Sequence, residues 1–185
     1  MRDLICDAFV TLDGFTSGAG SAAHFGSHGP ELDRWLASEL EQPQEVLLSG
    51  RTYAKLAAHS GGMSRDDPMN RRLSELPKVV FSGAPDEELA WGPTRRLRGD
   101  FGDRIRALKG EAGPPIRMIG SLKLVRRLLR DGLVDRLRLL VFPVVLGASG
   151  RGHLFDGLPE LEPTLIGCRT LDGSVVLLEY RLAGS

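Results

Sequence analysis

Short apolar runs alternate with amphipathic segments over the first two thirds of the chain. The runs with the length and continuity of buried strands lie at 4–10, 45–49, 77–83, 95–98 and 116–120. The segments with a helical pattern lie at 31–41, 51–58, 65–75, 101–109 and 121–131. Alternation of this kind predicts an α/β fold with a mostly parallel central sheet flanked by helices.

The last third of the chain has a different pattern. Residues 135–147 are strand-like, and 163–182 form two apolar runs around Asp172-Gly173, which is a strong hairpin signal. We therefore expect the sheet to end in an antiparallel C-terminal hairpin. A chain of 185 residues can bury about two thirds of its unfolded surface in one core. A single domain over 1–185 is predicted.

Two glycine-rich segments interrupt the pattern. Residues 15–30 are rich in Gly, Ser, Ala and His, and predict a long surface loop that can cover a site. Residues 146–155 predict a mobile loop at the rim of that site. His24 and His28 are expected to be exposed loop residues, because no ligand set with zinc spacing accompanies them. No metal site is predicted.

Composition and charge narrow the classes of partner. The formal charge is zero and the pI is near 6.9, so no global field draws the protein to nucleic acid or to an anionic membrane. No segment approaches the roughly 20 apolar residues that span a bilayer, and the N-terminus does not predict a signal peptide. Cys6 and Cys168 are expected to be buried thiols. A cytoplasmic protein is the resulting expectation.

Candidate chemistry lies where the predicted strands end. Ligands of parallel sheets bind beyond the carboxyl ends of the strands, where helix N-termini direct free N–H groups outward. Three strand ends carry glycine and hydroxyl residues there, at 49–52, 81–83 and 119–121. Glycine permits close backbone approach, and hydroxyls donate to phosphate oxygens. The alternative for each is an ordinary turn with a helix cap, since Ser and Thr are preferred caps.

Together these motifs resemble a known family. FVTLDG at 9–14, LLSGRTY at 47–53, LPKVVFSG at 76–83 and the block from 120 to 147 are similar to bacterial dihydrofolate reductase-like proteins. They also resemble the reductase domain of the bifunctional riboflavin-biosynthesis deaminase-reductase. The resemblance implies a dihydrofolate reductase-type fold, NADPH bound across the strand ends, and hydride transfer to a small pterin-like, pyrimidine-like or related heteroaromatic substrate. It also implies a homodimer.

The resemblance assigns cofactor-binding positions. They are Leu12, Gly14, Ser49, Gly50, Arg51, Thr52, Ser82, Gly83, Ile119, Gly120, Ser121, Leu122 and Lys123. Gly50 and Gly83 stand where the family usually carries arginine, the side chain that best grips a phosphate. Lys123, in place of the family's threonine, either compensates close to the pyrophosphate or is a solvated lysine. NADPH is therefore expected, and NADH is not excluded.

Two carboxylates are candidates for the proton donor. Asp33 matches by position the catalytic carboxylate of dihydrofolate reductases, and its alternative is a surface residue at a helix start. Asp7 lies inside an apolar strand, where a charge is costly unless it is paired. It can be a general acid if it faces the cleft, and a structural residue if it faces arginine or backbone donors. Asp13 is expected to stabilise its own turn, with the backbone of 12–14 near the nicotinamide.

Three functions follow from these observations. The first is an NADPH-dependent reductase. The second is a nucleotide-binding protein of the same fold without reductase activity, because a fold does not determine a function. The third is a dimeric small-molecule binding or resistance protein without a cofactor, against which the three strand-end sites argue.

Overall fold

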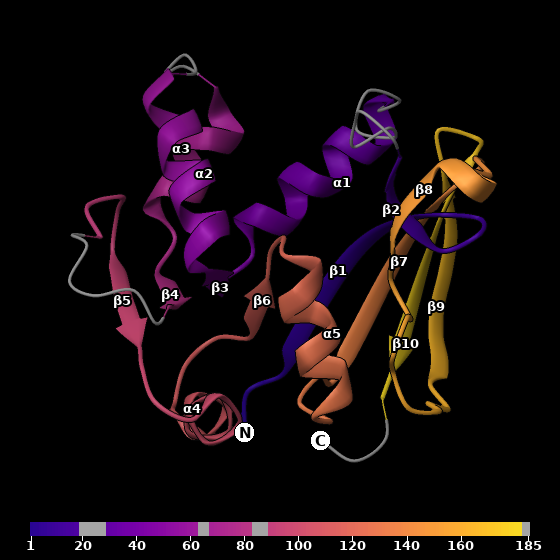
Figure 1. The fold of residues 1–185 in the computed structure, drawn as a ribbon. Helices are drawn as coiled ribbons and strands as arrows, with labels where there is room; N and C mark the ends of the chain where they lie inside the picture. Colours follow the sequence, from indigo (N-terminus) through magenta and orange to yellow (C-terminus); the bar gives the residue numbers. More distant parts are fainter. Residues whose placement is uncertain (19–28, 63–66, 83–88, 183–185) are drawn as a thin grey trace.

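The computed structural model describes residues 1–18, 29–62, 67–82 and 89–182. Within these residues, eight strands form one sheet in the order β5-β4-β3-β6-β1-β7-β10-β9 (Figure 1). The strands are β1 (Leu4–Thr11), β3 (Glu45–Ser49), β4 (Lys78–Phe81), β5 (Thr94–Leu97), β6 (Ile116–Met118), β7 (Arg136–Phe142), β9 (Thr164–Leu171) and β10 (Val175–Arg181). The predicted α/β architecture is confirmed.

Strand direction follows the two parts of the sequence pattern. Neighbouring strands from β5 to β7 pair in parallel, whereas β10 is antiparallel to both β7 and β9. Asp172 and Gly173 connect β9 to β10 with positive φ angles of 52° and 69°. Those angles are unfavourable for most residues, which is why Asp-Gly predicts this turn. The C-terminal antiparallel hairpin is confirmed.

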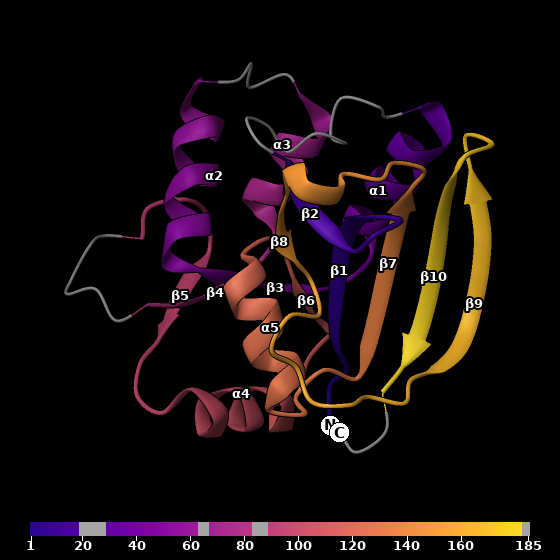
Figure 2. The same cartoon turned by 45° about the vertical axis from the view of Figure 1, so that its right-hand side comes forward.

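Five helices in the described residues cover the two faces of the sheet (Figures 1 and 2). On one face lie α1 (Pro30–Glu41), α2 (Gly50–Gly62) and α3 (Pro68–Glu75), and on the other lie α4 (Phe101–Gly110) and α5 (Leu122–Arg130). The start of β1 and the end of β10 both lie at the bottom of the molecule (Figure 2). In the described part of the chain, no helix is long and apolar enough to cross a membrane.

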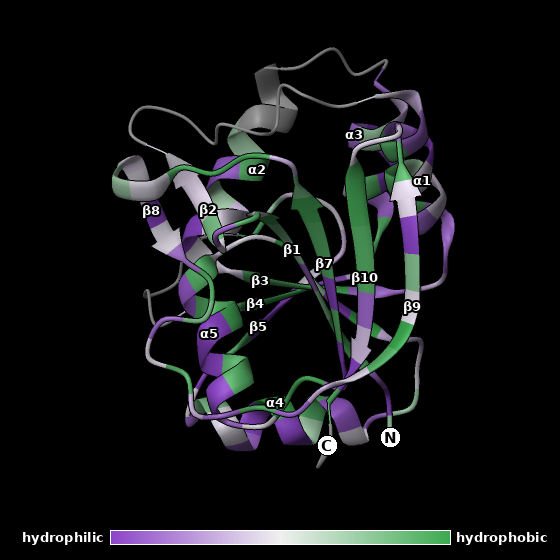
Figure 3. Cartoon of the chain, turned by 90° about the vertical axis from the view of Figure 1, so that its right-hand side faces the viewer, coloured by the Kyte–Doolittle hydropathy of each residue, from purple (hydrophilic) through white to green (hydrophobic). Residues whose placement is uncertain are grey.

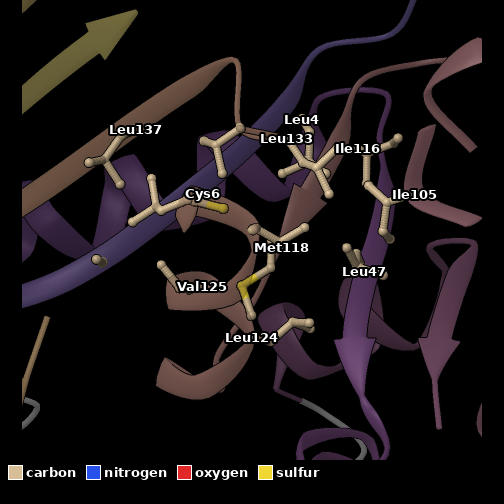
Figure 4. Packing of buried hydrophobic residues seen from close by; sticks show 14 of the residues in the cluster. Leu4, Cys6, Leu47, Ile105, Ile116, Met118, Leu124, Val125, Leu133 and Leu137 are labelled. Atoms are coloured by element: carbon tan, nitrogen blue, oxygen red, sulfur yellow. The ribbon is translucent and has the colours of Figure 1, made fainter. Parts of the chain in front are cut away.

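The largest core lies between the sheet and the helices α4 and α5. Cys6 and Met118 pack there against Val125, and α5 buries the same apolar stripe that its sequence predicts (Figure 4). Leu128 is fully buried, which contributes about 2 kcal/mol to folding. Burial also raises the pKa of the Cys6 thiol, which is consistent with a structural residue. β1, β7 and much of β10 are correspondingly hydrophobic in Figure 3.

Three predictions from the sequence were wrong in detail. Residues 15–18 are not loop but strand β2 (Phe15–Gly18), while 19–28, with His24 and His28, lie outside the described residues. Strand β8 (Gly150–His153) replaces much of the loop predicted at 146–155, because it pairs antiparallel with β2. Cys168 is exposed, since it lies on the edge strand β9. β2 and β8 form a separate two-stranded sheet beside the end of β1 (Figure 2).

Candidate active site

A cavity of about 550 Å³ opens where the three-residue strand β6 ends. β6 lies between β1 and β3 and pairs with residues 4–6 of β1 and 45–47 of β3. Both neighbours continue past Met118, to Thr11 and Ser49, so a gap remains between them at their carboxyl ends. This is the crevice in which ligands of open α/β sheets bind.

Apolar side chains form most of the cavity wall. The described lining residues are Asp7, Ala8, Phe9, Thr16, Leu36, Leu40, Thr52, Leu56, Met69, Leu73, Arg117, Met118, Ile119, Gly120, Ser121, Leu122, Val125 and Leu154. They come from β1, β2 and β6, from the helices α1, α2, α3 and α5, from the turn at 119–121, and from the segment after β8. A wall of this kind is typical of small-molecule sites.

Two predicted strand ends meet in this wall. Gly120 has a φ of 71°, and a Cβ at this position would lie 2.8 Å from Cγ2 of Thr52. Ser121 follows with a φ of 54°, a left-handed conformation that is uncommon outside glycine and is concentrated at functional sites. Helix α5 begins directly after Ser121, and its N-terminus lies next to the N-terminus of α2. Free N–H groups and positive dipole ends of two helices therefore face one cavity.

The turn at 49–52 also contains a helix cap, which is the alternative to ligand binding that the sequence left open. Ser49 Oγ accepts a hydrogen bond from the backbone N–H of Thr52 at 3.2 Å and lies 2.9 Å from Thr52 Oγ1. A Cβ on Gly50 would lie 2.8 Å from Oγ of Ser82, so a larger residue is excluded unless Ser82 moves. Arg51 is exposed on the first turn of α2. Capping and ligand binding are compatible, because one cap leaves other N–H groups unpaired.

The turn at 11–14 is organised by Asp13, as its sequence predicts. Its carboxylate accepts hydrogen bonds from Thr11 Oγ1 at 2.6 Å and from the backbone N–H of Gly147 at 2.7 Å. These bonds, that of Thr11 above all, lower the pKa of Asp13. Gly14 has a φ of 80° and packs against the ring of His153. Leu12 is 63% exposed at the tip of this turn.

Asp7 faces arginines. The sequence left open whether it is a general acid or a structural residue, and this contact is the one expected of a structural residue. Its Oδ1 lies 2.6 Å from Nε of Arg138, and its Oδ2 lies 2.6 Å from Nε of Arg117. Both oxygens of Asp7 are therefore engaged by guanidinium groups, as in a structural ion pair. The paired Asp7 nevertheless lines the cavity together with Arg117. Its predicted role as general acid is not supported by this geometry.

Asp33 lies on α1, one turn before the cavity. Positions 33, 36 and 40 share one side of a helix, and Leu36 and Leu40 line the cavity wall. The Asp33 side chain is exposed and is not among the described residues of the wall.

The cavity brings together some of the predicted site residues and omits others. Those in the wall are Asp7, Thr52, Ile119, Gly120, Ser121 and Leu122. The described residues that are not in the wall are Leu12, Gly14, Asp33, Ser49, Gly50, Arg51, Ser82 and Lys123. Gly83 lies outside the described residues. Lys123 is exposed on the first turn of α5.

Arg117 is the main lining residue that the sequence interpretation missed. It stands in the apolar run IRMIG, and it offers the same signal that singled out Asp7: a charged residue in an otherwise buried strand. Among the described residues, no group of three histidine, cysteine or acidic side chains can hold a metal ion.

The wall fits a dinucleotide cofactor. Gly120 allows backbone approach beside Thr52, and the Thr52 and Ser121 hydroxyls lie next to two helix N-termini. These are the groups that bind phosphates in α/β proteins. Met118, Ile119 and Leu122 supply an apolar surface beside them. These residues can therefore bind a nucleotide and shield it from water.

Comparisons with known proteins find relatives in sequence and in fold. YyaP of Bacillus subtilis (strain 168), an uncharacterized protein, is 26% identical over 187 residues, covering 99% of this chain and 96% of its own. A putative riboflavin biosynthesis protein from Shewanella sp. PV-4 has a similar structure, with a TM-score of 0.76, 18% identity, and coverage of 99% of this chain and 100% of its own.

A dihydrofolate reductase from Enterococcus faecalis, solved with NADP(H), shares the fold at a TM-score of 0.63 and 12% identity, with 98% of this chain and 97% of its own covered. The sequence profile of the RibD C-terminal domain matches residues 2–177. That match spans the strands, the cavity and most of the C-terminal hairpin. The chain belongs to the RibD C-terminal domain family.

Proposed function

We propose that the protein is an NADPH-dependent reductase that transfers hydride to a small pterin-like, pyrimidine-like or related heteroaromatic substrate. The observation that carries the proposal is the meeting of two helix N-termini, with Thr52, Gly120 and Ser121, at one wall of an apolar cavity. Membership of the RibD C-terminal domain family supports it. The shared fold with an NADP(H)-bound dihydrofolate reductase supports it further.

The cavity residues have different roles, and each role follows from the chemistry of its side chain. Thr52 and Ser121 donate hydrogen bonds to phosphate oxygens beside the helix N-termini. Leu36, Leu40 and Met118 would contact the rings of the cofactor and the substrate and exclude water from them. The cofactor supplies the hydride when it is bound. Asp33, exposed on α1 one turn before Leu36, supplies the proton, because both oxygens of Asp7 already accept hydrogen bonds from arginines.

Cofactor preference depends on the two glycines that replace arginine. Gly50 cannot carry a guanidinium where it stands, because its Cβ direction points at Ser82. Arg51 and Lys123 are exposed on the first turns of α2 and α5, which brings their positive charges near the phosphates. We propose that they favour NADPH over NADH by a smaller margin than a bidentate arginine provides.

The quaternary and cellular setting completes the proposal. Leu165 and Ile166 on the edge strand β9 are 52% and 42% exposed, and exposed apolar side chains at a sheet edge favour pairing with another chain. We propose a homodimer formed through β9. Cys6 and Cys168 are free thiols, which favours the reducing cytoplasm.

Titration with NADPH and NADH tests the proposal. Energy transfer from Trp35 and Trp91 to the reduced nicotinamide reports binding, and loss of nicotinamide absorbance reports turnover. We expect both nucleotides to bind, NADPH more tightly, and NADPH to be oxidised with at least one heteroaromatic compound. If neither nucleotide binds at millimolar concentration, the proposal is wrong. Binding without oxidation across pterins, pyrimidine-ribitol compounds and quinones would indicate a nucleotide-binding protein without reductase activity.

A further inference from the structure

The cavity reaches from one face of the sheet to the other. On the side of α5, Leu122 and Val125 line it, next to the strand ends proposed for the nucleotide. On the opposite side its wall comes from α1, α2 and α3, and α3 packs beside α1. We call this second side the helix compartment, and we define it by four lining residues: Leu40, Leu56, Met69 and Leu73.

Each of the three helices directs one side toward the cavity. Positions four apart share a side of a helix, and the wall contains such a pair from each helix: Leu36 and Leu40, Thr52 and Leu56, Met69 and Leu73. Leu40, Leu56 and Leu73 also pack in one hydrophobic cluster, so they adjoin one another. Beyond Thr52, at the N-terminus of α2, the three helices therefore present a continuous apolar surface.

The protein itself covers these side chains only in part. Leu56 and Leu73 are half-buried, and Met69 is 37% exposed. Covering apolar surface of this kind with an apolar group of a ligand removes it from water, which is favourable. Methionine is flexible and adapts its shape to such a group. The helix compartment is therefore accessible and favours an apolar part of the ligand.

The cations around the helix compartment are already engaged by other groups. Arg72 of α3 donates from Nε to the carbonyl oxygen of Leu40 at 3.0 Å and forms an ion pair with Glu41. Arg117 is paired with Asp7. The remaining arginine and lysine residues of the three helices are exposed and stand outside the described wall: Arg34, Arg51, Lys55 and Arg71. An anion would thus find no unengaged cation in the described wall, and burying an unpaired charge is costly.

The helix ends also disfavour an anion there. Asp67 caps α3, and its carboxylate accepts hydrogen bonds from the backbone N–H groups of Met69 at 2.8 Å and Asn70 at 3.2 Å. A negative charge is therefore already bound at the positive end of this helix. α1 contributes Leu40 from its last turn, close to the negative end of its dipole. Both helices favour an uncharged group over a phosphate or a carboxylate.

We propose that the helix compartment binds an uncharged alkyl or aryl substituent of the substrate, so the substrate is a heteroaromatic compound whose substituent carries no phosphate or carboxylate. This inference rests on the proposed reductase function and specifies its substrate class. The ring lies at the gap beyond β6, and the substituent extends from it between α1, α2 and α3. Each methylene that becomes buried there multiplies the affinity by about fourfold, whereas a charged end group loses its hydration without gaining a partner.

Matched series of compounds test the inference in the wild-type protein. Two series, built on 2-aminopteridine and on quinazoline, carry methyl, pentyl or 4-carboxybutyl at C6 and are measured by calorimetry without nucleotide. In at least one series we expect the pentyl member to bind about 10- to 200-fold more tightly than the methyl member, because it adds four methylenes. The 4-carboxybutyl member, which replaces the terminal methyl by a carboxylate, should bind no better than the methyl member.

Two results in the wild type would overturn the inference. The first is that pentyl gives no gain over methyl in either series, which includes the case in which no compound binds at millimolar concentration. The second is that the 4-carboxybutyl member binds as tightly as the pentyl member, because the helix compartment would then accept an anion.

Variants locate the gain from pentyl. Met69→Gln and Leu73→Asn place an amide of similar size in the helix compartment and should each reduce the gain by about threefold or more. Met69 is partly exposed, so Met69→Gln should fold, and denaturant unfolding checks Leu73→Asn. Val145→Gln is the control, because Val145 is exposed and outside the described wall. If both test variants keep the full gain, or the control loses as much as they do, the substituent binds elsewhere and the inference is wrong.

A reversed charge and the nucleotide complete the test. Met69→Arg should tighten binding of the 4-carboxybutyl member and weaken that of the pentyl member, and an unchanged carboxylate affinity would contradict the placement of the substituent against α3. The affinities are read without nucleotide, so the two levels of inference separate. A protein that prefers the pentyl member but does not bind NADPH would overturn the reductase function and leave the helix compartment as a ligand site. Equal kcat/KM of NADPH oxidation with the pentyl and 4-carboxybutyl members would keep the reductase and overturn the inference.

Discussion

Gly120 packs against the side chain of Thr52, so a Cβ at position 120 would lie only 2.8 Å from Cγ2 of Thr52. The two residues are distant in sequence and belong to different strand ends. Their contact brings the N-termini of α2 and α5 to one cavity wall. A single glycine therefore joins two sites that, taken separately, are ordinary helix starts.

Gly120→Ala tests this contact. The variant places a Cβ both in a left-handed conformation and against Thr52, so we expect lower stability and weaker binding of NADPH. Gly132→Ala is the matched control, because Gly132 has a φ of 63° and a Cβ added there would meet nothing within 4 Å. Each should lose about 1–2 kcal/mol of unfolding free energy to the backbone alone. Equal NADPH affinity in both variants would show that the contact between Gly120 and Thr52 does not contribute to cofactor binding.

Thr52→Val and Ser121→Ala test the two hydroxyls. If they bind phosphate, each change should weaken NADPH binding by about 1 kcal/mol, measured by fluorescence titration. Thr52→Val also removes the contact with Ser49 Oγ, so its unfolding should be measured alongside. Ser38→Ala is the control: this exposed hydroxyl donates to Trp35 O on α1, away from the cavity wall. Unchanged affinity in both test variants would place the nucleotide elsewhere.

The fold was predictable from sequence because its signals are local. Apolar runs of strand length, the stripe of α5 and the Asp172-Gly173 turn each act within a few residues. Strands β2 and β8 were missed because they are short, rich in glycine and paired with each other across a long stretch of chain. No local pattern reports such a partner. Cys168 was misassigned because its strand is an edge, which is a property of the whole sheet.

The site was predictable only in part for the same reason. Gly120, Ser121 and Thr52 were identified because each strand-to-helix turn is visible on its own. Whether Asp7 is an acid or an ion-pair partner depends on Arg117 and Arg138, which come from two other strands of the sheet. The sequence leaves that alternative open, and only the arrangement of β1 between β6 and β7 decides it.

Asp33→Asn tests the proton donor. The variant should reduce turnover at least about tenfold while leaving nucleotide affinity nearly unchanged, because Asp33 is not part of the cavity wall. Glu41→Gln, an exposed acid at the other end of α1, is the control. Steady-state rates across pH give the measurement. If the Asp33→Asn variant is fully active, the proton donor is water and not Asp33.

Leu165→Lys tests the homodimer. Leu165 is 52% exposed on β9, and a charge there should block pairing of this edge with a second copy. We expect light scattering to show a dimer for the wild type and a monomer for the variant. Val145→Lys is the control, because it places the same charge on an exposed apolar residue that is not on β9. A monomeric wild type would rule out the proposed assembly.

Asp172 in the hairpin turn stabilises the start of α1, and this contact should depend on pH. Its carboxylate accepts hydrogen bonds from the backbone N–H groups of Glu31 at 2.9 Å and Leu32 at 3.0 Å. Desolvation acts to raise the pKa of Asp172, but these hydrogen bonds outweigh it, and the pKa is lowered. The folded state therefore binds this proton less readily than the unfolded state does.

The stabilisation from Asp172 is thus fully present above the ordinary aspartate pKa of about 3.9, and it is lost as pH falls through the lower folded pKa. Asp172→Asn removes the charge and keeps a residue that tolerates the left-handed turn. We expect it to be less stable than the wild type at pH 7, with a gap that closes in acid. Denaturant unfolding of both proteins measures this, and Asp3→Asn controls for the loss of one negative charge. Only the charge of the carboxylate titrates over this range. If the stability difference between the two proteins stays constant into acid, the loss comes from the geometry of the amide and not from the missing charge.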